Sequence, residues 1–269
     1  MDCKPRLQST PEANSCNDEP SALRVRPVRA MNDFTAKDIE TLYRVMAARR
    51  DMRHFLPDAL DEALVSRLLR AAHLAPSVGF MQPWRFIRVR DRAVRERVYA
   101  LVESERLATA RALKEREDEF MRLKVEGVRE CGELLVAALM PGRERFVFGR
   151  RTLPEMDLAS VACAIQNLWL AARVEGIGMG WVSLFDPEAL RTLLRMPQGS
   201  RPVAVLCLGH VPAFYPRPML EEHHWAERCN LDDLVMTDCW VDPAETAPPS
   251  PPEPILTQSP AGPTSPDRS

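Results

Sequence analysis

Three arginines and one aspartate stand within five residues of this chain, in the run Arg49-Arg50-Asp51-Met52-Arg53. Each guanidinium presents a planar fork of N–H donors that fits phosphate oxygens, so the arginines favour an anion-binding site. The aspartate would repel an anion. Asp51 therefore either braces its arginine neighbours or has chemistry of its own. Alone, the run is more typical of a solvated basic helix end than of a site.

Two further turns carry glycines and polar side chains between apolar segments. These residues are Ser77, Gly79, Gln82, Gly178, Gly180 and Ser183. Glycine lets a backbone approach a flat ligand closely, and the amide of Gln82 can pair with an amide-like ring edge. Each residue alone is more often structural. Together with the arginines, the turns describe a pocket for an anionic, planar, hydrogen-bonding ligand, such as FMN or another phosphorylated aromatic molecule.

Several common sites lack their motifs in this chain. There is no G-x-G-x-x-G after a strand, no G-x-x-x-x-G-K and no G-x-S-x-G, which leaves dinucleotide-binding, P-loop and serine-hydrolase chemistry without support. The five histidines have no second ligand at metal-binding spacing, and the seven scattered cysteines form no C-x-x-C pair. We therefore predict no metal site and reduced thiols, with Cys163 and Cys207 in the core because both lie in apolar runs.

The composition is that of a globular protein with two polar ends. Residues 1–32 show no sustained period, and residues 241–269 hold nine of the 24 prolines, so a disordered leader and tail are expected around a folded domain at 33–240. The net charge of -2 argues against a general nucleic-acid binder. No apolar run has the length of a membrane span and no signal-peptide centre is present, so we expect a cytoplasmic protein without a membrane partner.

Apolar spacing and capping residues predict the elements that position these turns. Thr35 and Asp38 have the spacing of a capping box, which starts a helix that ends at the arginine run. The later elements expected are helices from 61, 91 and 186, a long helix at 154–175, and strands at 85–90, 134–140, 178–185 and 203–208. The long helix is apolar nearly all round, which predicts a buried central helix. The fold class is α+β or α/β, with layers of helices around a small sheet.

Residues 103–130 are dense in Glu and Arg and have only thin apolar spacing. Such a segment forms either a solvated helix pair or a cover over a ligand. Composition alone favours the solvated helix pair.

In combination, five motifs resemble those of the nitroreductase-like flavoprotein superfamily and, within it, of the 5,6-dimethylbenzimidazole synthase family. They are Arg49-Arg50-Asp51-Met52-Arg53, Ala75-Pro76-Ser77-Val78-Gly79-Phe80-Met81-Gln82-Pro83-Trp84, Met156-Asp157-Leu158, Gln166-Asn167-Leu168-Trp169-Leu170-Ala171-Ala172-Arg173 and Gly178-Met179-Gly180-Trp181-Val182-Ser183. The resemblance covers nearly all of residues 33–240. The motifs together are far more specific than the arginine run alone.

The resemblance implies a fold and a reaction. The fold is a small mixed sheet of four to five strands wrapped by helices, in an intertwined homodimer with flavin at the subunit interface. The reaction consumes its flavin, because reduced FMN reacts with O2 and is fragmented. The products are 5,6-dimethylbenzimidazole, the lower ligand of vitamin B12, and erythrose 4-phosphate. FMN is then a substrate, O2 is a co-substrate, and a separate flavin reductase supplies the reduced FMN.

The resemblance also implies roles for particular residues. Asp51, where ordinary nitroreductases usually have serine, and Ser183 are the catalytic positions. An acid/base role for Asp51 at the ribityl chain is chemically sensible, because C–C cleavage beside a carbonyl needs a base for a hydroxyl proton. Residues 103–130 match a lid, which reverses the preference from composition. The flavin-binding set is Arg49, Arg50, Asp51, Met52, Arg53, Ser77, Met81, Gln82, Pro83, Gly178, Gly180, Ser183 and Arg228.

Two other functions fit the same motifs. One is a flavin reductase or nitroreductase that oxidises NAD(P)H, against which Asp51 and the expected lid argue. The other is a flavin-binding protein without enzymatic activity.

Overall fold

The computed structural model of the protein describes residues 34–240, so the expected leader at 1–32 and the expected tail at 241–269 lie outside the described residues. The chain divides into two compact units with the boundary after Ala47.

Helix α1 (Ala36–Ala48) forms most of the described part of the first unit. The predicted capping box is confirmed, because the Thr35 backbone N–H donates to Asp38 Oδ2 at 2.9 Å and Asp38 N–H donates back to Thr35 Oγ1 at 3.3 Å. The helix ends directly before Arg49, as expected. Ile39, Leu42 and Met46 recur at helical spacing and are 50%, 51% and 45% exposed, so α1 carries an uncovered apolar stripe.

The second unit is built on a four-stranded sheet. Its strands are β1 (Trp84–Arg88), β2 (Glu133–Leu139), β3 (Gly178–Val182) and β4 (Arg201–Gly209), in the order β1-β2-β4-β3. Every neighbouring pair is antiparallel. The prediction of a mixed sheet is therefore wrong for these strands. The parallel pairing among the described residues is an isolated bridge between Asp51 and Met179, too short to make a fifth strand.

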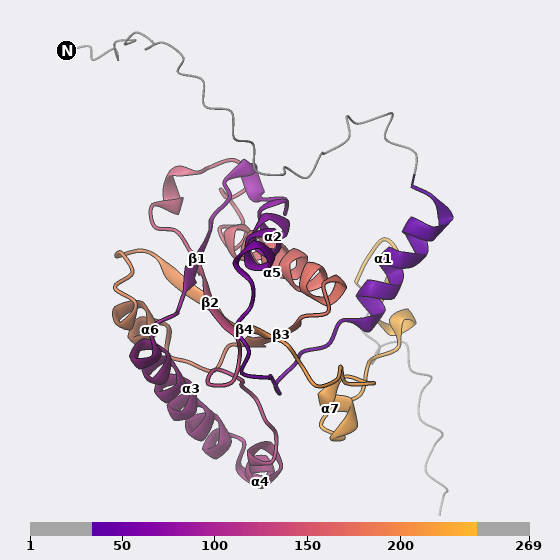
Figure 1. The fold of residues 1–269 in the computed structure, drawn as a ribbon. Helices are drawn as coiled ribbons and strands as arrows, with labels where there is room; N and C mark the ends of the chain where they lie inside the picture. The colour runs from indigo at the N-terminus through magenta and orange to yellow at the C-terminus, as the bar shows by residue number, and fades with distance from the viewer. Residues whose placement is uncertain (1–33, 241–269) are drawn as a thin grey trace, which may run out of the picture. The chain divides into compact units, whose positions relative to one another are not determined.

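Helices cover both faces of the sheet (Figure 1). On one face lie α2 (Glu62–His73) and α5 (Met156–Val174), and on the other lie α3 (Arg92–Ala112) and α6 (Pro187–Leu193). Alternate residues of β2 and β4 enter the two cores, so both central strands are buried on both faces. This explains the continuous apolar runs from which both strands were predicted.

Predicted helix starts are confirmed at three aspartates. The side chains of Asp61, Asp91 and Asp186 accept hydrogen bonds from the N–H groups three residues later, at 3.2, 3.0 and 2.6 Å. Helix α3 is longer than expected and takes in the start of residues 103–130. Short α4 (Glu117–Met121) and an irregular stretch complete that segment.

Two predictions about α5 are wrong. Cys163 is exposed, whereas Cys207 is buried as expected. Leu158 is 37% exposed and Val174 is 66% exposed, although the helix was expected to be buried all round. The reason is that α2 and the sheet pack against one side of α5 only. Its other side remains as an uncovered, partly apolar surface.

Residues 34–240 contain neither a helix that could span a membrane nor a cluster of metal-binding side chains. None of the helices combines the length and apolar character that a membrane crossing requires. In the same residues, no group of three or more His, Cys, Asp or Glu side chains is placed to hold a metal ion.

Candidate active site

The run of residues 49–53 passes alongside strand β3. The Met52 N–H donates to the Met179 carbonyl at 2.9 Å, and the Trp181 N–H donates to Asp51 Oδ1 at 3.0 Å. Gly180 makes this close approach possible, because a Cβ built there would lie within 3.0 Å of the Met52 carbonyl oxygen. The sheet edge therefore fixes the position of the Asp51 backbone and side chain together.

Asp51 is held at both carboxylate oxygens. Oδ1 accepts from Trp181, and Oδ2 lies 2.5 Å from Arg53 Nη2, which also donates to the Trp181 carbonyl at 2.9 Å. Burial raises the pKa of the Asp51 carboxyl above its ordinary value, and Arg53, the Trp181 N–H and Arg49 oppose that shift. A raised pKa lets the carboxylate accept a proton at a higher pH than an ordinary aspartate does, which suits a general base.

Two of the three arginines are engaged within the chain. Arg53 is 7% exposed, and its Nη2 is bound to Asp51 and Trp181, while its buried Nε and Nη1 find no partner among the described residues. Arg50 donates to the backbone carbonyls of Tyr215 at 3.1 Å, Arg49 at 2.8 Å and Pro216 at 2.9 Å. These two side chains therefore support the walls of the site.

Arg49 is better placed to meet an anion, whereas the exposed Arg228 lies 3.8 Å from Glu221 Oε1 and reaches Arg49 only through its charge. The Arg49 guanidinium lies 4.6 Å from the centre of the Trp169 ring. Burial lowers the pKa of Arg49; Asp51 opposes this shift, whereas the charges of Arg50 and Arg228 add to it. Three like charges close together are unfavourable until an anion neutralises them. The residues present therefore fit a bound phosphate group.

Asp51 lines two cavities. One, of about 210 Å³, has Asp51 and Arg53 among otherwise largely apolar walls, and the other, of about 130 Å³, has Arg49, Arg50 and Asp51. Residues 103–130 contribute to the larger cavity. The full lining of the larger cavity is Asp51, Arg53, Phe120, Leu123, Val125, Trp181, Val182, Ser183, Leu184, Met219, Leu220 and Trp225.

The segment at 103–130 is not simply solvated. Phe120 and Leu123 are 7% and 4% exposed, and both pack in a small core of their own. The Arg116 guanidinium stacks 3.6 Å from the centre of the Trp225 ring. The expectation of a solvated helix pair is thus wrong for these residues, because their sparse apolar side chains face the Asp51 cavity. That the segment acts as a lid stays a prediction.

The remaining residues predicted near β3 have different surroundings. Ser183 follows the strand, is exposed, and lines both the Asp51 cavity and a neighbouring cavity of about 510 Å³. Met52 has no exposed surface, so in the described residues it offers no atom to a ligand. A Cβ built at Gly178 would clash with Val211 Cγ1 and lie 3.2 Å from Met52 Cγ, and one built at Gly180 would clash with the Met52 carbonyl oxygen.

The turn at residues 77–83 lies away from Asp51. Val78 N–H donates to Ser160 Oγ at 3.0 Å near the start of α5, whereas Trp169, nine residues later, donates to the Arg50 carbonyl at 3.2 Å. Nine residues of α-helix span about 14 Å. Among the described residues, neither cavity lined by Asp51 includes a member of this turn. One chain therefore does not bring the two predicted halves of the site together.

Within the turn, the predicted residues hold one another. Ser77 Oγ accepts from the Gln82 backbone N–H at 3.0 Å, and the Gln82 side-chain amide lies 3.5 Å from the Phe80 carbonyl. Met81 and Pro83 are buried. Ser77 and Gln82 are half-buried and keep part of their surface free.

Two aromatic residues at the site were missed from the sequence. The Tyr215 hydroxyl accepts from the Arg53 N–H at 3.2 Å and pairs with His54 Nδ1 at 2.6 Å. Trp169 supports Arg49 and bonds to Arg50, although its position in an apolar helix indicated only a core residue. Tyr215 follows the apolar run Val211-Pro212-Ala213-Phe214, so nothing in the local sequence marked it as a site residue.

The model of the nitroreductase family matches residues 46–210. With the antiparallel sheet between helices and the arginine-flanked carboxylate beside it, this match defines the class: the chain belongs to the nitroreductase family.

Its relatives specify the resemblance further. The chain is 45% identical over 184 residues to a 5,6-dimethylbenzimidazole synthase of Rhodospirillum rubrum, covering 67% of this chain and 86% of that protein. It is 39% identical over 198 residues to a 5,6-dimethylbenzimidazole synthase of Rhodobacter capsulatus, covering 72% and 95%. The resemblance carried by the motifs is thus confirmed.

The fold is shared with a solved structure of oxidised iodotyrosine deiodinase bound to FMN and 3-iodo-L-tyrosine. The TM-score is 0.53 at 24% identity, and the match covers 65% of this chain and 94% of that one. At this identity the likeness supports the fold alone.

Proposed function

We propose that this protein uses O2 to break reduced FMN into 5,6-dimethylbenzimidazole, erythrose 4-phosphate and a third fragment that holds the rest of the pyrimidine half of the ring, so that FMN is its substrate. The similarity to 5,6-dimethylbenzimidazole synthases supports this reaction. The observation that carries it is Asp51, a carboxylate held by Arg53 and Trp181 between a largely apolar cavity and an arginine-lined one. Each turnover uses one FMN, so a separate reductase is needed to supply reduced FMN.

Each group of residues has a distinct role in this proposal. Bound reduced FMN supplies the electrons for O2 and the carbon atoms of both products. Arg49 and Arg228 neutralise the phosphate, and Arg53 holds Asp51 in place. Asp51 takes a hydroxyl proton from the ribityl chain, and the Ser183 hydroxyl hydrogen-bonds the ring. Residues 103–130 exclude water from the cavity through Phe120 and Leu123.

We infer that the complete site needs two chains. The turn at 77–83 and the run at 49–53 are anchored about two and a half turns apart on α5, and neither Asp51 cavity includes the turn, which supports a site completed by the turn of a second copy. The uncovered apolar stripe of α1 and the exposed side of α5 supply surface for such a homodimer. An isologous dimer would build two equivalent sites.

Mixed dimers test this arrangement. We expect Asp51→Asn and Gln82→Trp homodimers to be inactive, the second because a bulky ring blocks the turn. A heterodimer of the two variants, isolated through two different tags, should recover about half of the wild-type activity, because one of its two sites combines an intact Asp51 with an intact turn. An inactive heterodimer would place both halves of the site in one chain.

Product analysis tests the reaction itself. Purified protein is mixed with chemically reduced FMN and air, and the products are separated by chromatography. We expect dimethylbenzimidazole and erythrose 4-phosphate, with neither formed when the protein is left out. Intact FMN together with rapid NADPH oxidation would instead show a flavin reductase, and intact FMN with tight binding would show a flavin-binding protein.

A further inference from the structure

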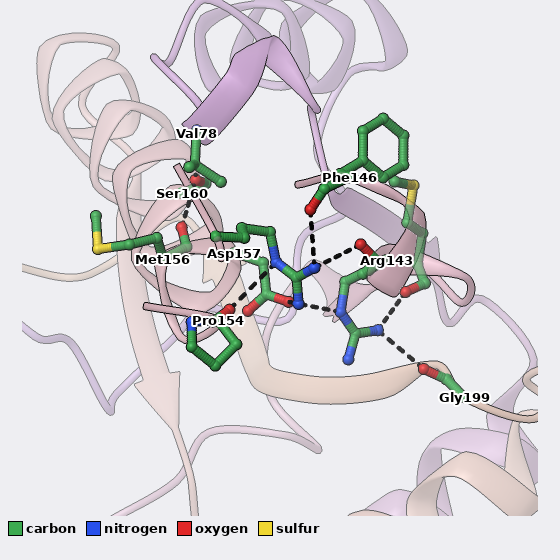
Figure 2. A network of polar contacts seen from close by, with 10 residues as sticks. Val78, Arg143, Phe146, Pro154, Met156, Asp157, Ser160 and Gly199 are labelled. Carbon is green, nitrogen blue, oxygen red and sulfur yellow. Dashed lines mark hydrogen bonds and ion pairs between the residues drawn. The ribbon is translucent and has the colours of Figure 1, made fainter. Parts of the chain in front are cut away.

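Two arginines share one buried aspartate at the start of α5 (Figure 2). Asp157 Oδ2 lies 2.8 Å from Arg143 Nε and 3.1 Å from Arg150 Nη2. The side chains of Arg143, Arg150 and Asp157 are 18%, 12% and 8% exposed. We call these three residues the Asp157 triad. It is separate from the Asp51 cavities, and the proposed reaction does not use it.

The remaining donors of the triad fasten the chain around it. Arg143 Nη1 donates to the carbonyls of Met140 and Gly199, the latter at 2.9 Å. Arg150 Nη1 donates to the Arg143 carbonyl at 2.5 Å and the Phe146 carbonyl at 3.3 Å, and its Nε donates to the Pro154 carbonyl at 3.3 Å. The loop at 143–151 is thereby joined to the end of β2 at Met140, to the segment before β4 at Gly199, and to the start of α5 through Asp157. Its own backbone contributes one short 3-10 helix and a turn in which the Arg150 and Arg151 N–H groups donate to the Val147 carbonyl at 3.0 and 3.1 Å. The arginine side chains supply the contacts that join the loop to the rest of the fold.

This loop packs directly against the turn at 77–83. A Cβ built at Gly79 would lie 2.9 Å from the Phe148 carbonyl oxygen, and one built at Gly149 would lie 2.6 Å from Val78 Cγ2. Ser160, one helical turn after Asp157, accepts from the Val78 N–H and donates to the Met156 carbonyl at 2.7 Å. Figure 2 shows the Val78 contact and the triad side by side on the same end of α5.

The turn needs this support because its backbone is strained. Gly79, Phe80 and Gln82 have φ angles of 53°, 51° and 50°, and two of them are not glycine. Residues outside glycine hold the left-handed conformation only where their surroundings impose it. The surroundings here are the loop at 143–151 and Ser160.

We propose that the Asp157 triad positions the turn at 77–83, so that its members Ser77 and Gln82 are presented to the flavin of the site. The inference rests on the proposed function, since that function assigns the flavin contact to this turn. Buried ion groups often add little stability compared with apolar residues of similar size. The triad instead fixes one loop conformation, and the loop fixes the turn. Arg143, Arg150 and Asp157 are positioning residues that touch no substrate.

An apolar replacement separates positioning from stability. In the triple variant Arg143→Met, Asp157→Leu and Arg150→Met, no buried charge is left unpaired, but the backbone carbonyls lose their arginine donors. The thermal midpoint should therefore fall less than in Asp157→Leu alone, which leaves two arginines unpaired. The Kd for oxidised FMN, measured by quenching of flavin fluorescence, should rise at least about tenfold, because a displaced binding group loses its contacts. With reduced FMN, KM should rise far more than kcat falls, because Asp51 is untouched.

A more exposed ion pair at the far end of the same helix serves as the control. Arg67 and Glu175 join α2 to the end of α5 through bonds of 2.9 and 3.1 Å, away from the turn. Replacing them by methionine and leucine should leave the Kd for FMN unchanged. If the triple variant is folded and binds FMN as tightly as the wild type, the triad has no positioning role.

A single substitution covers the case in which the triple variant does not fold. Arg150→Lys keeps the charge but cannot reach Asp157 and three carbonyls together. We expect it to raise the Kd for FMN, and an unchanged Kd would overturn the proposal. Because binding of oxidised FMN needs no turnover, a wild-type protein that binds FMN without forming dimethylbenzimidazole would refute the proposed function and still leave the triad tested.

Discussion

Asp51→Asn should lower the rate of dimethylbenzimidazole formation by about 100-fold or more, the scale usual for loss of a general base. The amide keeps the shape of the carboxylate, and its oxygen can still accept from the Trp181 N–H. It cannot take a proton. FMN binding should therefore change little, because Arg49 and Arg228, the arginines proposed to bind the phosphate, are intact. The measurements are product formation in single turnover and the Kd for oxidised FMN.

The control for this substitution is Asp58→Asn. Asp58 is an exposed aspartate in the same stretch of chain, seven residues further on, and its replacement should leave both measurements unchanged. Wild-type product yield from the Asp51→Asn protein would remove Asp51 from the chemistry. A large loss of FMN binding in that protein would mean that the carboxylate serves binding and not proton transfer.

Gly180→Ala should destabilise the protein by about 3 kcal/mol, at the upper end of the usual cost of overpacking. The new methyl group would lie within 3.0 Å of the Met52 carbonyl oxygen and of Arg53 Nη1. A backbone oxygen cannot swing away as a flexible side chain can. The run at 49–53 must therefore move off β3, which breaks the contacts that hold Asp51. We expect lower stability in urea unfolding and, in the protein that remains folded, strongly reduced product formation.

Gly176→Ala separates this clash from the general cost of replacing a glycine. Gly176 has a φ of 75°, but a Cβ there would meet nothing within 4 Å. Its replacement should cost only the left-handed strain, about 1–2 kcal/mol, and leave product formation intact. Equal stability loss and full activity in both variants would show that the Gly180 contact is not required for the site.

The positions of the central strands and of the helix starts could be predicted from the sequence. The short continuous apolar runs of β2 and β4 favoured strands buried on both faces, and each predicted aspartate cap depends on residues three positions apart. The outer side of α5 was different. Leu158, Cys163 and Val174 are apolar residues typical of a core. Only the three-dimensional packing shows that they lie on the side of α5 that no other described element covers.

The site was predictable in its residues but not in their arrangement. Spacing identified the arginine run, yet it cannot tell whether a guanidinium faces a ligand or, as with Arg50, the carbonyls of a segment 165 residues away. The Asp51–Trp181 contact and the separation of the turn at 77–83 also depend on long-range packing. The burial of Phe120 was hidden for the same reason, because a few apolar residues in a charged segment give no clear period.

Strand β3 is an edge of the sheet, and an open edge invites pairing with another chain. The run at 49–53 occupies that edge. The Met52 N–H donates to the Met179 carbonyl, and Asp51 accepts from the Trp181 N–H. The Arg53 side chain donates to the Trp181 carbonyl. The contacts that position the proposed catalytic carboxylate therefore also occupy the edge groups through which the sheet could pair with another chain. Substitutions that loosen this run should be costly in solubility as well as in catalysis.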